Sequence, residues 1–338
     1  MLWSGKGYHV KNGSEVRIPC GTPFRYESDC PGSKFQILFG MDEITDITAK
    51  YQPIYIEEHF KSLEGLHTFS LQFFKDVAEL YDVLTRIKNV ERNPTGYSID
   101  DAPILGLLVR VGKLLKECVK YYEHNNAEII AIIERPLIEA STIATYLMLN
   151  GQEAIEDYRK CSYKDRLRIL RNLESGSSFF DTKAGKRLLA AVQEKMAFEG
   201  LTKDDFAEQK KNRWKIQGKS FRDIFAEIEH DDLYPATYGM MSESIHGSWN
   251  ESMDWGLVRN DDRTFSAFTN HHPADIRYMA PTINFTIRPF RLWLERIDAY
   301  DDNFKGTMDW IERVNTRLFR TFDSFYDGEY DAKKSKAS

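Results

Sequence analysis

Cysteine is scarce in this chain of 338 residues, which contains only four. Cys20, Cys30, Cys118 and Cys161 form no CxxC pair, so neither a zinc ribbon nor a thiol redox motif is predicted. Glycine (20 residues) and proline (11) are also infrequent, while 42% of the residues are hydrophobic. This composition excludes a disordered chain and a collagen-like repeat, and it predicts a globular protein long enough for a sizeable core.

A long uncharged apolar segment is missing as well. The most apolar stretch, 127–149, carries Glu134, Arg135 and Glu139 near its middle, where charge is most costly in lipid. A buried helix is therefore predicted there, and no interaction of the chain with a membrane is expected. The first 19 residues have no apolar core after their first basic residue, so we expect no secretory signal and a cytoplasmic location.

Common catalytic signatures are absent from the sequence. It contains no GxGxxG after a strand, no GxxxxGK[ST], no GxSxG and no HExxH. Kinases, dinucleotide-dependent enzymes and hydrolases of these types are therefore disfavoured, and no cofactor is predicted.

What the sequence does contain is helical periodicity, which predicts a mainly α fold. Apolar residues recur every three or four positions over 54–90, and helices are also expected at 104–122 and 127–149. The turn between the last two is short enough to make them antiparallel neighbours. Shorter helices are expected at 152–160, 164–175, 182–199, 219–230, from 234 onward, at 274–299 and at 307–322.

The domain organisation follows from this pattern. Residues 1–50 are predicted to form an irregular or β-hairpin cap, with a turn at Lys11–Ser14. Residues 51–330 are predicted to form a multi-helix bundle with one β-hairpin insert near 255–268, around Asn260-Asp261-Asp262. Residues 331–338 are expected to be a disordered tail.

A polar stripe crosses the apolar segment 127–149. Arg135 and Glu139 are four residues apart and share one helix face, which Thr142 and Tyr146 extend. A helix that is apolar on most sides is buried, so this stripe is predicted to point inward and to be paired or to face a polar cavity. Pro136 predicts a kink at this position. The stripe either builds a site or forms a structural ion pair.

A second polar stripe lies on the helix expected from residue 234. Tyr238, Ser242 and His246 are spaced by four residues. Histidine changes charge near neutral pH, so His246 is the candidate general acid or base, with Tyr238 and Ser242 placed to orient it or a bound phosphate. The alternative is a buried histidine that bonds to a hydroxyl one turn away.

A metal site is a further alternative. The pattern ExxH occurs twice, at Glu227/His230 and at Glu243/His246, and paired ExxH motifs hold two metal ions in some helical bundles. Glu134 or Glu139 could complete such a set. The two motifs are only 16 residues apart, and Glu227 and His230 have the surroundings of an exposed helix end, so no metal ligand is assigned.

Charge is distributed unevenly along the chain. The formal net charge is −6, but the segment 159–222 contains 17 Lys/Arg and 8 Asp/Glu and carries +9, which leaves −15 for the rest. This segment could bind RNA or a nucleotide. The alternative is that its helices are solvated and pair with the acidic remainder of the chain. The sequence is also compatible with a homo-oligomer.

Two groups of residues resemble a known pattern. Arg135-Pro-Leu-Ile-Glu139 and the residues up to Tyr146 are similar to the Arg-x3-Glu core helix of an uncharacterised bacterial all-helical family, a domain of unknown function. A second group of residues resembles the second half of the same family's pattern: Trp214, Ser220-Phe-Arg222, Tyr234, Tyr238, Ser242 and His246-Gly-Ser-Trp249. The resemblance covers residues 55–300. It implies an all-helical fold that pairs Arg135 and Glu139 with Ser242 and His246 around one site.

The architecture also resembles, distantly, the HEPN helical domains, many of which are metal-independent ribonucleases. Their signature is an Arg followed by a His after four to six residues. This chain departs from it, because the nearest pairs, Arg222/His230 and Arg263/His271, have seven residues between them.

Together these patterns give two functional hypotheses. In the first, catalytic residues His246, Arg135 and Glu139 and ligand-binding residues Tyr238, Ser242 and Tyr146 form a polar site for a phosphate-containing ligand. Its enzymatic version is a metal-independent, ribonuclease-like defence protein. In the second, the chain is a non-enzymatic interaction module whose two polar stripes are buried structural networks.

Overall fold

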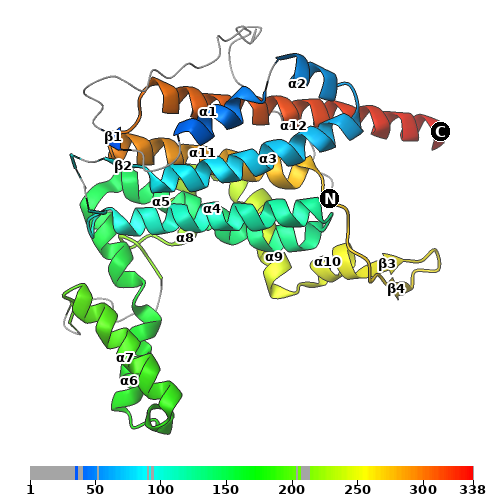
Figure 1. Ribbon diagram of the computed structural model, residues 1–338. Helices are drawn as coiled ribbons and strands as arrows, with labels where there is room; N and C mark the ends of the chain where they lie inside the picture. Colours follow the sequence, from blue (N-terminus) through cyan, green and yellow to red (C-terminus); the bar gives the residue numbers. More distant parts are fainter. Residues whose placement is uncertain are drawn as a thin grey trace.

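The computed structural model describes residues 35–36, 41–51, 53–89, 91–92, 95–202, 205–206 and 214–337. They form a mainly α fold, as the sequence predicts (Figure 1). The turn expected at Lys11–Ser14 lies outside the described residues. The end of the expected cap is helical and not irregular, because α1 (Met41–Ala49) buries Ile44 and Ile47 against the main core.

The segment 54–90 contains two helices where one continuous helix was expected. They are α2 (Pro53–His59) and α3 (Leu63–Arg86). The interruption has a local cause: the side chain of Ser62 accepts a hydrogen bond from the Gly65 N–H at 3.1 Å and so caps the start of α3. Hydrophobic spacing alone does not register such a cap.

A small sheet that the sequence did not predict joins a strand before α1 to a strand after α3. The strands β1 (Phe35–Gln36) and β2 (Lys88–Asn89) pair antiparallel, with Phe35 opposite Asn89. Strands of two residues are too short for any periodicity to reveal them.

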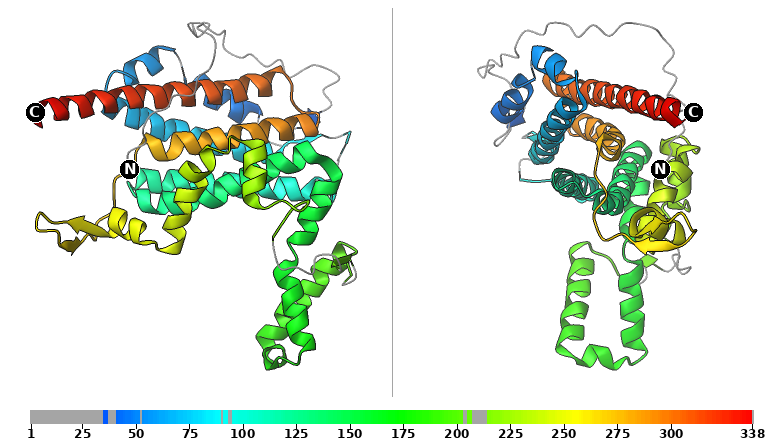
Figure 2. Two further views of the ribbon diagram at one scale, coloured as in Figure 1. Left: turned by 180° about the vertical axis from the view of Figure 1, so that it is seen from behind. Right: turned by 90° about the vertical axis from the view of Figure 1, so that its right-hand side faces the viewer.

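Five long helices form the bundle. They are α3, already described, α4 (Ala102–Glu123), α5 (Ala127–Cys161), α11 (Ile276–Arg296) and α12 (Asp302–Ala337). Views from two further directions show these helices packed side by side (Figure 2). Their common core contains large, fully buried side chains, among them Phe69, Phe73, Tyr81, Tyr146, Phe290 and Trp293.

Helix α5 is the central element, because it packs against α4, α8, α9 and α11. Its backbone is continuous through Pro136, where a kink was expected. The departure from helical geometry occurs instead at Gly151, with φ 73° and ψ −156°. The sequence predicted two separate helices here, at 127–149 and 152–160. The backbone does break there, although a helical segment resumes at once and runs to Cys161.

Beyond α5 the chain forms a two-helix arm that projects away from the bundle (Figure 1). The arm consists of α6 (Lys164–Glu174), the short 3-10 helix η1 (Ser178–Asp181) and α7 (Lys183–Phe198). It has a small hydrophobic core of its own, made of Tyr163, Leu170, Val192, Met196 and Phe206.

The chain then returns to the bundle and carries the second polar stripe. Helix α8 (Phe221–Ile228) packs on α5, and the π-helix η3 (Pro235–Gly239) continues directly into α9 (Met240–His246). The short helix α10 (Trp249–Glu251) and the π-helix η4 (Ser252–Gly256) follow.

The expected hairpin insert is confirmed. Strands β3 (Leu257–Arg259) and β4 (Phe265–Ala267) pair antiparallel, with Val258 opposite Ser266. The hairpin projects from one end of the molecule (Figure 1).

At the C-terminus, α12 continues to Ala337, although a disordered tail was expected from residue 331. Alanine and lysine, which are frequent among the last residues, have high helix propensity, which explains a helix in this segment. Among the described residues, no helix combines the length and the apolar character needed to cross a bilayer.

Candidate functional site

The two polar stripes meet where α9 and η3 pack on α5. Arg135 donates a hydrogen bond from Nη2 to the hydroxyl of Tyr238 at 3.1 Å, and this hydroxyl donates to Oε2 of Glu139, also at 3.1 Å. The guanidinium of Arg135 lies over the Tyr238 ring, 4.6 Å from its centroid. Tyr238 therefore links the two charged side chains of α5, which are one helical turn apart.

His246 completes this cluster at the last residue of α9. Its Nε2 lies 3.5 Å from Nη1 of Arg135. We call Arg135, Glu139, Tyr238 and His246 the Arg135 network. Its members differ in exposure: Tyr238 is buried, Arg135 and Glu139 are half-buried, and His246 is exposed. The network therefore runs from the edge of the core to the surface, whereas the sequence predicted an inward stripe.

Aromatic packing fixes the position of Tyr238. Its ring lies 4.4 Å from that of Phe221 and 5.4 Å from that of Tyr234. Burial, the strongest influence, and the nearby carboxylate of Glu139 together raise the pKa of Tyr238 to about 12. The hydroxyl is thus protonated at neutral pH and available as the donor to Glu139.

Two of the predicted ligand-binding residues, Ser242 and Tyr146, use their hydroxyls in bonds outside the Arg135 network. Ser242 donates from Oγ to the backbone carbonyl of Tyr238 at 2.8 Å, so its hydroxyl is used within its own helix. The hydroxyl of Tyr146 donates to Oε1 of Gln217 at 2.6 Å, and Nζ of Lys219 lies 5.1 Å from its ring centroid. Among the described residues, neither hydroxyl bonds to Arg135, Glu139 or His246, so helix-face spacing alone extended the predicted stripe too far.

The ExxH motifs do not form a metal centre within the described part of the chain. Glu227 forms an ion pair with Lys219, and Oε2 of Glu243 accepts a hydrogen bond from Ser248 at 3.2 Å. No group of three or more His, Cys, Asp or Glu side chains is placed to hold a metal ion there. The geometry gives the metal alternative no support.

Glu134 is the acidic residue whose environment the sequence did not reveal. It is only 5% exposed, and its carboxyl accepts a hydrogen bond from Thr282 Oγ1 at 2.8 Å. Burial raises its pKa to about 8, and the opposing effect of the Thr282 hydrogen bond is smaller. Glu134 is next to Arg135 in sequence but faces α11. The apolar positions at 130, 137 and 138 around it were the available signal.

The basic segment 159–222 makes few ion pairs in the part of the chain that the structure describes. Arg159 pairs with Glu199 at 2.7 Å, and Lys219 pairs with Glu227. The first of these pairs lies inside the segment itself. The second joins the segment to an acidic residue outside it, and the alternative that the segment pairs with the acidic remainder of the chain stays a prediction.

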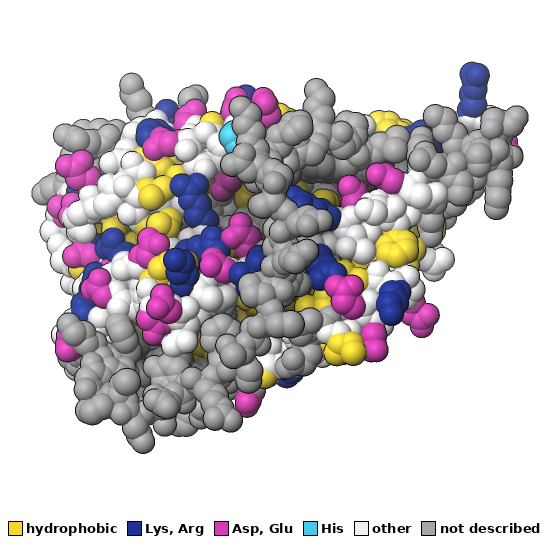
Figure 3. Space-filling model, turned by 90° about the horizontal axis from the view of Figure 1, so that it is seen from above, with side chains coloured by type: hydrophobic (Ala, Val, Ile, Leu, Met, Phe, Trp, Pro, Cys, Tyr) yellow, Lys and Arg dark blue, Asp and Glu magenta, His cyan; other side chains and the backbone are white. Residues whose placement is uncertain are grey.

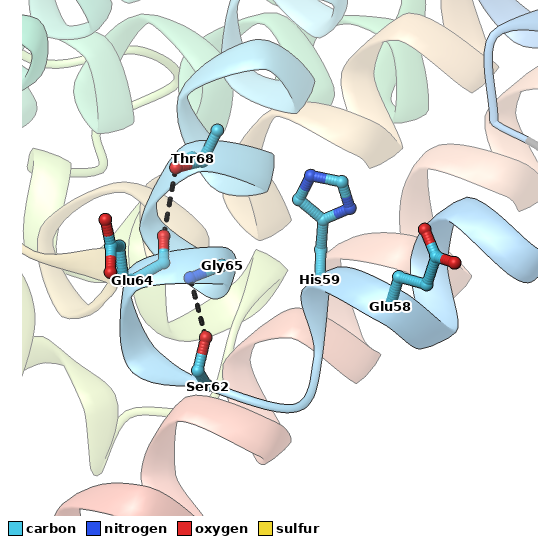
Figure 4. Close-up of a pocket in the computed structure, with 6 residues that line it drawn as sticks. All are labelled: Glu58, His59, Ser62, Glu64, Gly65 and Thr68. Atoms are coloured by element: carbon cyan, nitrogen blue, oxygen red, sulfur yellow. Dashed lines mark hydrogen bonds between the residues drawn. The ribbon is translucent and has the colours of Figure 1, made fainter.

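Two surface cavities lie apart from the Arg135 network. One, of about 350 Å³, lies between the end of α2 and the start of α3 and is lined by Glu58, His59, Ser62, Glu64, Gly65 and Thr68 (Figure 4). The other, of about 460 Å³, lies beside the β3–β4 hairpin, and Glu128, Trp255, Phe268 and His271 contribute to its lining. Neither cavity contains a member of the Arg135 network, and both present carboxylates, which disfavour a phosphate.

Comparison with known proteins gives one match. Residues 101–264 match the model of a family of unknown function (DUF5677). The matched region extends from the first residues of the α4 segment to the hairpin and includes the whole Arg135 network. No curated protein and no solved structure matches this chain. The match agrees with the resemblance to an uncharacterised domain and assigns no activity.

Proposed function

We propose that the Arg135 network binds the phosphodiester of RNA and cleaves it without a metal ion. The observation that carries this proposal is the placement of His246, an exposed imidazole, 3.5 Å from a guanidinium that a buried tyrosine holds in place. An arginine can neutralise a phosphate through two parallel hydrogen bonds, and a histidine can move protons near neutral pH.

The proposed reaction is an internal transesterification. His246 accepts the proton of the ribose 2′-hydroxyl, and the 2′-oxygen then attacks phosphorus. The bond from phosphorus to the 5′-oxygen breaks, and a water molecule protonates this leaving oxygen. Arg135 stabilises the additional negative charge on the phosphoryl oxygens, and Glu139 acts through Tyr238 as a positioning residue. The products are a 2′,3′-cyclic phosphate and a free 5′-hydroxyl.

Apolar side chains beside His246 support a single-stranded substrate. Trp249 starts α10 three residues after His246 and is 60% exposed, and Ile245 is 44% exposed. The Trp249 ring packs edge-on against Phe265 at 5.7 Å, which restricts its motion. Unpaired bases stack on exposed aromatic rings of this kind, whereas bases within a duplex are already stacked.

The test is incubation of purified protein with single-stranded RNA in chelator. Wild-type protein is expected to generate cyclic phosphate ends, and His246→Ala to lower the rate by about 100-fold or more, the usual range for a lost general base. His230→Ala is the matched control, because His230 is also an exposed histidine that follows an ExxH spacing. Absence of cleavage by wild-type protein, or cleavage that survives His246→Ala, contradicts the proposal.

A non-enzymatic interaction module is the second candidate. The observation that favours it is that the Tyr238 hydroxyl already bonds to both Arg135 and Glu139, so these two ions are joined without a ligand. This hypothesis predicts that Arg135→Met lowers the melting temperature by several degrees and that His246→Ala, at an exposed position, changes it little. RNA cleavage that depends on His246 separates the two candidates.

A further inference from the structure

The exposed residues of the arm formed by α6, η1 and α7 can be assigned to the sides of its helix pair. Its helices are antiparallel and enclose a stripe that includes Leu167 and Leu170 of α6 and Gly185, Val192 and Met196 of α7. In two antiparallel helices, the residues that directly follow the inward positions lie on the same side of the pair. The sequence therefore assigns each exposed residue of the arm to a side.

One side carries cations and no carboxylate. The residues that follow the inward positions on it are Arg168, Arg171, Lys186, Ala190, Gln193 and Ala197, and Lys183 lies one turn before Lys186. We call Arg168, Arg171, Lys183 and Lys186 the basic side. All four are exposed. Both carboxylates of the tip, Glu174 and Asp181, lie at the end of α6 and in η1, outside these positions.

The cations of the basic side are not used within the described structure. Arg171 bonds only to the carbonyl of Leu167 in its own helix, and no ion pair joins the four side chains to a carboxylate of the described residues. The N-terminus of α7, next to Lys183 and Lys186, adds the positive end of a helix dipole. Four unpaired cations on one side of a projecting element favour a polyanionic partner.

Other surfaces of the molecule differ from this side. Lys and Arg side chains are intermixed with Asp and Glu on the face seen from above (Figure 3). Helices α11 and α12 illustrate the mixture, because Arg291 pairs with Asp309 at 2.6 Å and with Glu312 at 2.7 Å. Neutralisation by neighbouring carboxylates is therefore common on the bundle and absent from the basic side of the arm.

We infer that the basic side of the arm binds the phosphate backbone of the RNA that the Arg135 network acts on. The inference rests on the proposed function in taking RNA as the ligand. The arm projects from the bundle at a distance from α9, so it would hold a part of the strand away from the reacting phosphodiester (Figure 1). Contacts of lysine and arginine with phosphates carry affinity and no sequence preference.

The test measures the affinity for a fluorescently labelled single-stranded RNA over a range of salt concentrations. The variant Arg171→Gln/Lys186→Gln removes two cations of the basic side. The matched control, Arg187→Gln/Lys195→Gln, removes two exposed cations from other sides of the same arm. We expect only the first variant to weaken binding. It should also make the negative slope of log affinity against log salt shallower by about 1.4, or about 0.7 per lost phosphate contact.

Four results overturn the inference: equal weakening by both variants, no effect of either, no RNA binding by the wild type, or binding of the basic side to vesicles of anionic lipid in place of RNA. Melting curves of both variants check that the arm remains folded. The cleavage assay with His246→Ala tests the proposed reaction separately from the binding of RNA by the basic side. If the first variant alone weakens binding and RNA is not cleaved, the binding of RNA by the basic side stands and the proposed reaction fails. If RNA is cleaved and both variants bind equally, the reverse holds.

Discussion

The hydroxyl of Tyr238 holds together two charged side chains of α5, and its contribution can be separated from that of its ring. Tyr238→Phe keeps the packing on Phe221 and the contact with the Arg135 guanidinium but leaves Arg135 and Glu139 without their shared partner. Hydrogen bonds to charged groups contribute about 1.5–3 kcal/mol when buried. Because both ions are half-buried, we expect urea unfolding to show a loss of about 1–2 kcal/mol.

Tyr234→Phe is the control for this prediction. The Tyr234 ring also packs in the cluster, 5.4 Å from Tyr238, but no hydrogen bond of its hydroxyl is present among the described residues. Loss of the Tyr234 hydroxyl should change the free energy of unfolding by less than about 0.5 kcal/mol. Equal effects of the two substitutions would show that the hydroxyl of Tyr238 is not what holds the network together.

A second prediction at this scale concerns Glu134 and pH. The folded chain holds a proton on Glu134 up to a pKa of about 8, whereas the unfolded chain releases it near the ordinary glutamate pKa of 4.5. Between these values the folded state binds more protons, so the free energy of unfolding falls as pH rises. The contribution is fully present below pH 4.5 and is lost as pH passes through 8.

Glu134→Gln removes this titration while keeping an oxygen that can accept from Thr282. Between about pH 5 and 7.5, wild-type protein should lose about 1.4 kcal/mol per pH unit more than the variant, as measured by urea unfolding. Glu117→Gln, at an exposed position of α4, serves as the control and should leave the wild-type pH dependence intact. Parallel pH profiles for wild type and Glu134→Gln would contradict the assignment.

At the scale of the element, Gly151 determines where α5 bends. Its φ of 73° and ψ of −156° lie in a region that residues with a side chain rarely adopt, and nothing lies within 4 Å of an added Cβ. Gly151→Ala should therefore destabilise the protein through backbone strain alone, by about 1–3 kcal/mol. The measurement is the free energy of unfolding in urea.

Gly106→Ala provides a control of opposite sign. Gly106 lies in α4 with an ordinary helical φ, is exposed, and also has nothing within 4 Å of an added Cβ. Alanine has the higher helix propensity, so this substitution should stabilise the protein by up to about 1 kcal/mol. Stabilisation by both substitutions would mean that Gly151 does not require its left-handed conformation.

Elements differ in how far the sequence predicts them. Long amphipathic helices such as α4, and the hairpin at 255–268, were predicted because their signals lie within the segment itself. The separation of α2 from α3 and the pairing of β1 with β2 were not, because they depend on one capping hydroxyl and on residues more than 50 positions apart. The Arg135 network was anticipated in its members, but its actual link, the Tyr238 hydroxyl between two ions, depends on tertiary packing.

At the scale of the whole molecule, the described residues form two hydrophobic cores of very different size. The main core joins α3, α4, α5, α11 and α12, whereas the core of the arm contains five buried side chains. Few buried contacts and many solvent-exposed backbone hydrogen bonds favour local opening. The arm is therefore expected to open at a lower free energy than the bundle, without global unfolding.

Hydrogen exchange followed by mass spectrometry tests this hierarchy. Peptides from α7 should exchange faster than peptides from α4, and Met196→Ala, which removes a buried side chain of the arm, should accelerate α7 alone. Met308→Ala, in the main core, should instead accelerate peptides throughout the bundle, since a buried Met→Ala change costs about 2–5 kcal/mol. If α7 and α4 exchange in step in wild type and in both variants, the arm and the bundle are one cooperative unit. Because RNA bound to the basic side would protect α6 and α7 selectively, the same measurement with RNA present reports whether the arm is where the polyanion binds.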